Sequence, residues 1–287
     1  HDGRCGIRIM TKIHPTAIID PSAEIAKSAS IGPYCTVGPR VHIGEDCVLR
    51  SHCHITSLTR MGRGNEIHPF ALVGGDPQDL KFHGEPTWLE MGDFNMIREH
   101  ATIHRGTGNG GGITRIGSHN LVMGNVHIAH DCIIGNHCIF ANNAMLAGHV
   151  HVDDYANIGG GAGLHHFVKV GYCGFVGGMA RVSKDVPPFM LAEGSPAAIR
   201  GYNHVAMSRI GMDEMELEAV KEAYKKIYRL RGGAGVTKIA SLLRDFPTSK
   251  ALRRIAESIR AVNEGLNGRS LEVKRTDDKR AVRVVRG

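Results

Sequence analysis

The sequence predicts an all-β solenoid, a parallel β-helix, followed by a C-terminal α-helical domain. Three observations indicate this fold: an apolar residue recurs at every sixth position, a small residue usually follows it four positions later, and this period stops at a proline pair. The composition agrees with it, because aromatic residues make up only 5% of the chain and 37 of its 287 residues are glycine. A solenoid with a narrow interior and frequent corners needs few large rings and many glycines.

The period of six runs through the first two thirds of the chain with two interruptions. Such a run of apolar residues at one fixed spacing does not arise by chance from ordinary composition. The repeat positions are Ile13, Ile19, Ile25, Ile31, Val37, Ile43, Leu49, Ile55, Met61, Ile67, Val73, Met91, Ile97, Ile103, Ile116, Val122, Ile128, Ile134, Phe140, Leu146, Val152, Ile158, Leu164, Val170, Val176 and Val182.

Alanine or cysteine often stands four positions after the repeat residue, as at Ala17 and Ala144. One large and one small inward side chain in six residues describe one short strand and one tight corner. Three such units close a coil of about eighteen residues, and parallel coils stack at ~4.8 Å. The same small position holds five cysteines, which we therefore interpret as core residues and not as metal ligands. They are Cys35, Cys47, Cys53, Cys132 and Cys138.

Bulk composition excludes several classes of protein. The chain is 42% hydrophobic and 22% charged, and it has no run of eighteen apolar residues, so we expect no membrane span. Seven cysteines without the paired spacing of a disulfide framework favour a reducing, cytoplasmic location. The formal charge of +7 is concentrated in residues 269–286, which hold seven basic and three acidic residues. The body of the chain is nearly neutral, so we expect no nucleic-acid partner.

The period and the composition divide the chain. Residues 1–9 are expected to lie upstream of the domain, and residues 10–187 to form the β-helix. Residues 188–267 are expected to form the helical domain, and residues 268–287 a basic, disordered tail.

Capping residues predict three helices within the helical domain. Asp213 with Glu216 predicts the start of the first, "VTKIASLLRDF" forms the second, and Thr248 caps a third that ends at Gly265.

Two insertions, residues 74–90 and 104–115, interrupt otherwise regular coils. Loops that leave a solenoid commonly hold binding groups. The second insertion contains "GTGNGGG", but it lacks the Gly-Lys-Ser/Thr ending of a phosphate-binding loop and a helix after it. We therefore interpret it as a flexible excursion.

Several histidines depart from the inward phase of the repeat. His130, His149, His165 and His166 each follow a repeat residue by one to three positions, and those repeat residues are spaced by eighteen. They therefore gather near one corner of the prism on successive coils. We expect them either to bind zinc or to act on a substrate.

The chain resembles a known family of enzymes in its longer motifs. "IHPTAII", "IGPYCTVGP", "QDLKFHGEPT", "TIHRGT", "HIAHDCIIGN", "ANNAMLAGHV" and "DVPP" resemble the acyl-[acyl-carrier-protein]:UDP-N-acetylglucosamine O-acyltransferases of lipid A biosynthesis, from about Met10 to about Leu266. The resemblance implies a left-handed β-helix and a cytoplasmic homotrimer with sites between neighbouring prisms. It implies neither a cofactor nor a metal, and no integral membrane contact. The implied reaction moves a 3-hydroxyacyl chain from acyl carrier protein to the glucosamine 3-position of UDP-N-acetylglucosamine.

The resemblance also implies roles for individual residues. His130 matches the general base, Asp131 the group that orients it, and the Gly148 amide the oxyanion donor. Gly178 matches the position that limits acyl length, and its lack of a side chain favours a long chain. The other substrate-contacting positions are Asp79, Lys81, His127, His149, His165, His166, Asn203 and Arg209.

Two residues depart from the family pattern. His166 stands where glutamine is frequent, and Val205 where a nucleotide-contacting glutamate is common.

Three other interpretations of the function stay open. The first alternative is the related N-acyltransferase, which normally carries an additional N-terminal domain, whereas twelve residues precede the repeat here. The second is a trimeric zinc carbonic anhydrase with histidine ligands. The third is a non-catalytic scaffold, which has no need of clustered histidines beside long loops.

Overall fold

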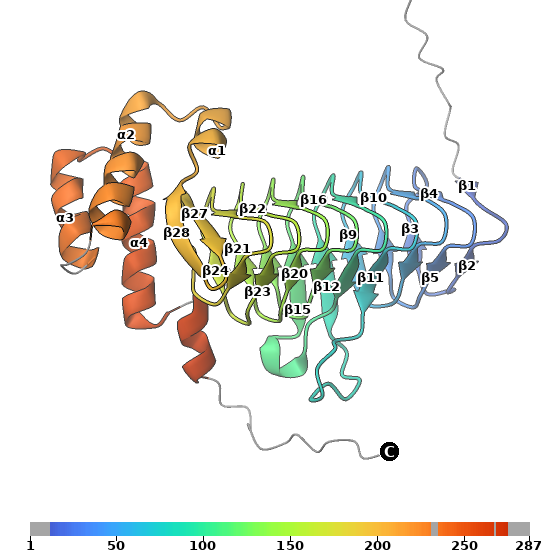
Figure 1. Ribbon diagram of the computed structural model, residues 1–287. Helices are drawn as coiled ribbons and strands as arrows, with labels where there is room; N and C mark the ends of the chain where they lie inside the picture. Colours follow the sequence, from blue (N-terminus) through green and yellow to red (C-terminus); the bar gives the residue numbers. More distant parts are fainter. Residues whose placement is uncertain (1–11, 231–234, 267, 275–287) are drawn as a thin grey trace, which may run out of the picture.

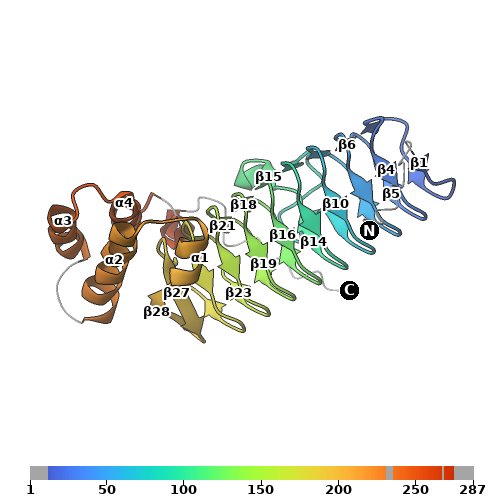
Figure 2. The same cartoon turned by 90° about the horizontal axis from the view of Figure 1, so that it is seen from above.

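The computed structural model describes residues 12–230, 235–266 and 268–274. Residues 1–9 lie outside these ranges, as do residues 275–287 of the tail. Most of the described chain forms a long three-sided prism, and helices cover its C-terminal end (Figure 1). Figure 2 shows the coils following one another along a single axis. The predicted left-handed parallel β-helix with C-terminal helices is confirmed.

Each side of the prism is one sheet, named here A, B and C, and the chain visits them in that order. Sheet A contains β1 (Lys12–Ile13), β4 (Ser30–Ile31), β7 (Val48–Leu49), β10 (Glu66–Ile67), β13 (Met96–Ile97), β16 (Leu121–Val122), β19 (Ile139–Phe140), β22 (Asn157–Ile158), β25 (Phe175–Val176), β27 (Met190–Gly194) and β28 (Ala197–Tyr202). Sheet B contains β2 (Ile18–Ile19), β5 (Thr36–Val37), β8 (His54–Ile55), β11 (Leu72–Gly75), β14 (Thr102–His104), β17 (His127–Ile128), β20 (Met145–Leu146), β23 (Gly163–Leu164) and β26 (Arg181–Val182). Sheet C contains β3 (Glu24–Ile25), β6 (His42–Ile43), β9 (Thr59–Met61), β12 (Trp88–Met91), β15 (Ile113–Ile116), β18 (Ile133–Ile134), β21 (His151–Val152) and β24 (Lys169–Val170).

The repeat residues form the core of the prism. From Ile31 to Val182 every one of them is buried, whereas Ile13 in the first coil is 46% exposed because no coil covers that end. The five cysteines at the small position are buried as predicted. Burial raises the pKa of Cys132 and of Cys138 to about 12, so both remain neutral thiols.

Both insertions leave the prism where sheet B passes into sheet C, and Figure 1 shows them projecting from the same side. They are shorter than predicted, at residues 76–87 and 105–112, because β11, β12, β14 and β15 extend into them. Trp88 pairs with Ile113, and Gly75 pairs with His104. The second insertion is also more ordered than expected, since it contains the short helix η1 (Gly108–Gly110) capped by Thr107.

The prism does not end at the proline pair, which corrects the expected boundary at residue 188. β27 continues sheet A by pairing with β25, and β28 folds back against β27 as an antiparallel strand. The helices begin only afterwards, with α1 (His204–Arg209), α2 (Glu214–Ala223), α3 (Gly235–Asp245) and α4 (Lys250–Glu264). The predicted first helix corresponds to α2 together with a π-helix, η2 (Tyr224–Arg229).

The caps of the helices agree with the prediction at two of three points. Asp213 accepts a hydrogen bond from the Glu216 N–H at 2.8 Å, and Gly265 ends α4 with φ 62°. The predicted Thr248 cap is wrong, because the Ser249 side chain accepts from the Leu252 N–H at 3.1 Å. The Glu216 carboxylate also accepts from the Lys250 N–H at 2.6 Å, which ties α2 to the start of α4.

The expectation of a disordered tail is wrong for its first residues. Gly268–Lys274 forms the short helix η3, which Figure 1 shows on the same side of the prism as the loops. Its Arg269 contacts the β-helix through Asp185 and His165.

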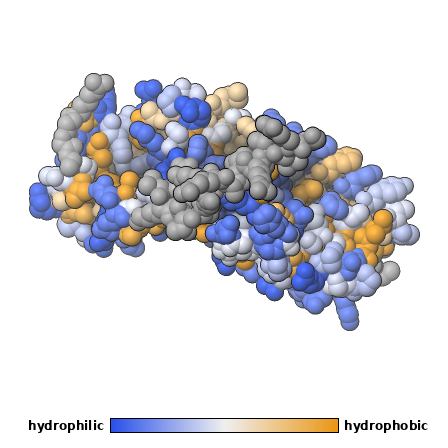
Figure 3. All heavy atoms as spheres, turned by 90° about the horizontal axis from the view of Figure 1, so that it is seen from below, coloured by the Kyte–Doolittle hydropathy of each residue, from blue (hydrophilic) through white to orange (hydrophobic). Residues whose placement is uncertain are grey.

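The surface of the described chain is mixed in polarity. Figure 3 shows apolar residues in separate groups among polar ones. Ile18, in the first coil, is 71% exposed. Within the described ranges, no helix combines the length and apolar character that a membrane-spanning helix requires.

Candidate active site

The predicted histidines meet at the edge between sheets B and C, where the loops also emerge. Asp131, His149 and Phe167 occupy equivalent corner positions on successive coils, with φ of 59°, 62° and 62°. The left-handed backbone at each corner directs these side chains outward along one line. The His149 ring stacks on Phe167 with centroids 4.4 Å apart, and it meets His130 edge-on at 5.3 Å.

His130 and Asp131 form the centre of this column. His130 is 6% exposed and Asp131 is 5% exposed. The His130 Nδ1 lies 2.7 Å from Asp131 Oδ2, and the Nε2 of His149 lies 3.7 Å from the same oxygen. Since an ionised carboxylate only accepts, the His130 Nδ1 donates to Asp131 and its Nε2 is left to accept a proton.

The second loop fixes the Asp131 carboxylate. Thr107 donates its N–H to Oδ1 at 2.9 Å and its hydroxyl to Oδ2 at 2.7 Å. A Cβ on Gly110 would lie 2.1 Å from the Asp131 Cγ, so only glycine lets the loop approach this closely. Asp131 therefore receives three hydrogen bonds, and these hold its orientation.

The two loops are also tied to each other. Arg105, which is 5% exposed, pairs with Asp76 and donates to the Thr87 carbonyl at 3.2 Å. Glu85 accepts from the Gly108 N–H at 3.0 Å, and hydrogen bonds from the His83, Glu85 and Gly108 amides lower the pKa of its carboxyl. This bracing places the first loop over His130.

The first loop brings Asp79, one of the positions expected to contact substrate, close to His130. Asp79 Oδ2 lies 3.9 Å from His130 Nε2, while its Oδ1 accepts from the Lys81 N–H at 3.0 Å. The atom of His130 that can take up a proton therefore faces a carboxylate from the loop.

Gly148 lies directly against the His130 ring. A Cβ at this position would be 2.5 Å from His130 Cε1 and 2.7 Å from Nε2. Within the described chain the Gly148 N–H donates no backbone or side-chain hydrogen bond, so it remains able to donate to a ligand beside the imidazole.

Beside this edge, sheet B carries the predicted His127 and a second histidine, His104, which the sequence did not predict as a site residue. His127 lies on β17 and bonds Thr102 Oγ1 through Nδ1 at 2.8 Å, and burial together with His130 lowers its pKa. His104 contacts His127 edge-on at 4.9 Å, and burial, His127 and His130 lower its pKa to about 4. His127 and His165 line a shallow groove of about 390 Å³ on sheet B.

Three predicted residues lie elsewhere in the single chain. Asn203 and Arg209 line a pocket of about 450 Å³ between α1 and sheet A, together with Val205. Asn203 also caps α1 and donates to the Cys173 carbonyl at 2.9 Å. Gly178 is exposed at the edge between sheets A and B.

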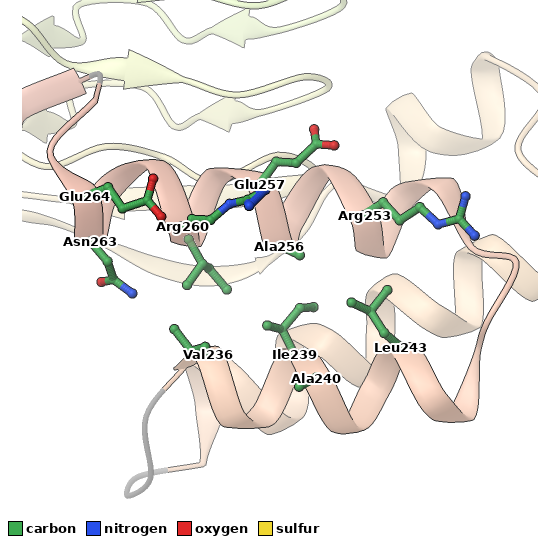
Figure 4. Close-up of a pocket in the computed structure, with 11 residues that line it drawn as sticks. Val236, Ile239, Ala240, Leu243, Arg253, Ala256, Glu257, Arg260, Asn263 and Glu264 are labelled. Atoms are coloured by element: carbon green, nitrogen blue, oxygen red, sulfur yellow. The ribbon is translucent and has the colours of Figure 1, made fainter.

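A larger hollow belongs to the helical domain. It has about 500 Å³ and lies between α3 and α4, where Val236, Ile239 and Leu243 of α3 point toward the side of α4 that carries Ala256 (Figure 4). None of its lining residues is a histidine or a cysteine, and its titratable side chains are two glutamates and two arginines.

Sequence reasoning missed several residues that build the site. The sequence predicts only a flexible excursion for the segment that holds Thr107, Gly110 and Arg105, yet these residues orient Asp131 and join the two loops. The motif "TIHRGT" contains two of them, Arg105 and Thr107. A threonine immediately before a glycine run is a capping signal that could have found Thr107.

One group of side chains in the described chain has the spacing of metal ligands. His130, Asp131 and His149 each offer one atom, and these atoms lie within 4.8 Å of one another. However, both Asp131 oxygens already accept hydrogen bonds, and Oδ2 is bonded to the same histidine that would share the metal. This arrangement fits a hydrogen-bonded acid–base pair better than a ligand set.

A hexapeptide β-helix with a buried His–Asp pair under two braced loops fits a hexapeptide-repeat transferase, and comparisons with known proteins agree. Residues 22–57 and 113–148 match the bacterial transferase hexapeptide model. Residues 185–267 match the second domain of UDP-N-acetylglucosamine O-acyltransferase.

Solved structures resemble the chain over most of its length. LpxA from Acinetobacter baumannii is 46% identical, with 86% of this chain and 96% of that one covered and a TM-score of 0.83. UDP-N-acetylglucosamine O-acyltransferase from Moraxella catarrhalis is 45% identical, with 86% of this chain and 96% of that one covered and a TM-score of 0.81. The UDP-N-acetylglucosamine acyltransferase of Arabidopsis is 36% identical, with 87% of this chain and 96% of that one covered and a TM-score of 0.75. The chain belongs to the UDP-N-acetylglucosamine O-acyltransferase family.

Proposed function

We propose that this protein transfers a 3-hydroxyacyl chain from acyl carrier protein to the glucosamine 3-hydroxyl of UDP-N-acetylglucosamine, the first step of lipid A biosynthesis. Family membership supports the reaction class. The observation that carries the mechanism is the buried His130–Asp131 pair at 2.7 Å, with the His130 Nε2 left to accept a proton.

In the proposed mechanism His130 is the general base. Its Nε2 takes the proton of the acceptor hydroxyl while that oxygen attacks the thioester carbonyl carbon. The Gly148 N–H donates to the oxyanion that forms on the carbonyl oxygen. The intermediate then expels the thiolate of the carrier, which takes the proton back from His130, so the products are an ester and a thiol.

Asp131 acts in this mechanism through His130. Its carboxylate holds the Nδ1 proton, so the imidazole presents an unprotonated Nε2 to the hydroxyl and is stabilised once protonated. The two hydrogen bonds from Thr107 keep the carboxylate in this orientation.

The other predicted residues would bind substrates. Asp79 and Lys81 belong to the loop above His130, while His127, His149, His165 and His166 lie along sheet B and its edge with sheet C. We assign the sugar and phosphate contacts to this group.

The distribution of these residues favours a homotrimer. Asn203 and Arg209 line a pocket against sheet A, whereas His130 lies at the opposite edge between sheets B and C. One chain cannot place both sets on one substrate, but a neighbouring prism can. An acyl chain in the groove between two prisms would end near Gly178, which presents no side chain. We place this trimer in the cytoplasm, where acyl carrier protein is available.

The proposal is tested with purified protein, 3-hydroxyacyl carrier protein and UDP-N-acetylglucosamine, with mass spectrometry of the product. We expect a mass increase of one 3-hydroxyacyl group on the sugar nucleotide. A parallel reaction with the 3-amino analogue separates ester from amide formation. Absence of acylated product with both acceptors would refute the proposed function.

The zinc carbonic anhydrase alternative is tested by metal removal. We expect dialysis against a chelator to leave acyl transfer unchanged, because the proposed proton transfers use only His130 and Asp131. Metal analysis of the same sample is the control. Stoichiometric zinc, together with loss of activity on chelation, would favour the anhydrase over the transferase.

A further inference from the structure

The C-terminal segment that follows the family domain returns to the proposed site. The family match ends at residue 267, and η3 begins at Gly268. The Arg269 N–H donates to Asp185 Oδ1 at 3.1 Å, and the Lys169 N–H donates to the same oxygen at 2.8 Å. Gly268 has φ 66°, and a Cβ there would lie 2.0 Å from Asp185 Oδ2. Asp185 therefore anchors this segment against the prism.

The anchor lies at the end of the column of corner residues. Asp185 follows β26 at the turn from sheet B to sheet C, one coil beyond Phe167. Phe167 stacks on His149, and His149 lies 3.7 Å from Asp131. The segment thus extends the same edge that holds the proposed base.

The side chain of Arg269 contacts two residues of the proposed substrate site. Its Nη1 lies 2.8 Å from His165 Nδ1 and donates to the His166 carbonyl at 2.7 Å. A guanidinium is a donor only and stays protonated, so the His165 Nδ1 must accept this hydrogen bond. An imidazole that accepts through Nδ1 is neutral and carries its proton on Nε2.

We infer that Arg269 is a positioning residue, which holds His165 as the Nε2–H tautomer so that this proton is donated to a substrate oxygen in the sheet B groove. His165 is exposed and lines that groove with His127 and Arg181. The inference rests on the proposed function, because it assigns the groove to the acyl-transfer substrates. It adds a specificity contact from a segment outside the family domain.

The first test replaces the side chain while leaving the anchoring backbone N–H in place. Arg269→Met removes the donor to His165, and Arg269→Lys keeps a cationic donor. Arg244→Met, at an exposed arginine of α3, is the matched control. We expect Arg269→Met to raise the KM for one substrate by roughly 2–10-fold with little change in kcat. This is the result of losing one neutral hydrogen bond from His165 to the substrate that is equally strong in the ground state and in the transition state. Arg269→Lys should stay within about twofold of the unmodified protein.

The second test reads the tautomer directly and does not depend on activity. In protein with ¹⁵N-labelled histidine, assigned with His165→Gln, we expect His165 to be protonated on Nε2 at pH 7.5. Arg269→Met should give a mixture of forms, and Arg269→Lys should preserve the single form. Protonation of Nδ1 in the unmodified protein, or an Arg269→Met variant with unchanged His165 signals and unchanged KM, would overturn the inference. Failure of acyl transfer in the unmodified protein would refute the proposed function, while the histidine spectra would still decide the role of Arg269.

Discussion

Two edges of the prism have the same backbone but different surroundings. At the edge between sheets A and B, Tyr34, His52, Phe70 and His100 have φ of 56–64° and stack with centroids 5.0–5.1 Å apart. At the edge between sheets B and C, the corner residues from Asp131 to Phe167 have φ of 59–62° and also form a column. Tyr34 is 59% exposed, whereas Asp131 is 5% exposed.

The difference is made by the loops. No loop leaves the edge between sheets A and B within the described coils, so its rings contact mainly one another and solvent. The two loops at the other edge bury a carboxylate, supply its hydrogen bonds through Thr107 and bring Asp79 toward a histidine. The edge between sheets B and C therefore differs from the edge between sheets A and B in holding a buried carboxylate that orients the neighbouring His130.

Replacement of the proposed base should have the largest effect. His130→Ala is expected to lower kcat by 10²–10⁴-fold, because loss of a general base typically costs that much. His52→Ala, which removes a stacked histidine from the uncovered edge, is the matched control and should retain activity within about threefold. Activities are compared by acyl transfer and folding by circular dichroism. Equal losses in the two variants would remove the distinction between the edges.

A methyl group beside the proposed base should have a somewhat smaller effect. In Gly148→Ala the new Cβ would lie 2.5 Å from His130 Cε1, so the imidazole must move. A displacement of about 1 Å can cost about 10²-fold in rate. Gly201→Ala is the control, since a Cβ there meets Leu191 Cβ only at an ordinary 3.9 Å. Wild-type turnover in Gly148→Ala would show that the ring position does not limit catalysis.

A histidine beside the edge between sheets B and C, His104, should also make the stability of the protein depend on pH. Burial and two neighbouring histidines lower the pKa of His104 to about 4, while an unfolded histidine has a pKa of about 6.5. Between these values the unfolded chain binds a proton that the folded chain excludes, so stability falls as pH decreases through this window. The loss should reach about 2 kcal/mol near pH 4.5.

His104→Gln removes this titration and should flatten the dependence. Thermal unfolding of both proteins at pH 7.5 and pH 4.5 measures the difference. His52→Gln, at the exposed edge, should leave the dependence as it is in the unmodified protein. A steeper loss of stability in His104→Gln would contradict the assignment of this proton.

The smallest effect is expected at the edge between sheets A and B, where Gly178 should influence the preferred length of the acyl chain. A Cβ on Gly178 would meet only the Gly160 carbonyl, at 3.4 Å, so a larger side chain fits without disturbing the prism. Gly178→Met should favour shorter 3-hydroxyacyl donors, since each lost buried methylene weakens binding by about 0.8 kcal/mol. Competition between long and short donors measures the preference. A change in Met179→Ala but not in Gly178→Met would assign acyl length to the neighbouring residue, which is 78% exposed.

The sequence by itself determined the prism. A period of six with one large and one small inward residue leaves few ways to bury the chain, and from Ile31 onward the structure follows that period at each repeat position. It also brought His130 and His149 together, because a spacing of about eighteen residues places them one coil apart. The capping residues located two helix ends for the same reason, since local hydrogen bonds decide them.

Only the tertiary structure decided what lies over the edge between sheets B and C. The contacts of Thr107 with Asp131 and of Arg269 with His165 join residues 24 and 104 positions apart, and no repeat specifies their register. Their positions depend on how irregular segments fold back on the prism. Gly110 and Gly268 allow close approach there, and the Asp131 and Asp185 carboxylates accept the hydrogen bonds of these segments. A periodic sequence fixes regular coils through repeated burial, but the loops and the C-terminal segment are placed by individual polar contacts that exist only after the prism has formed.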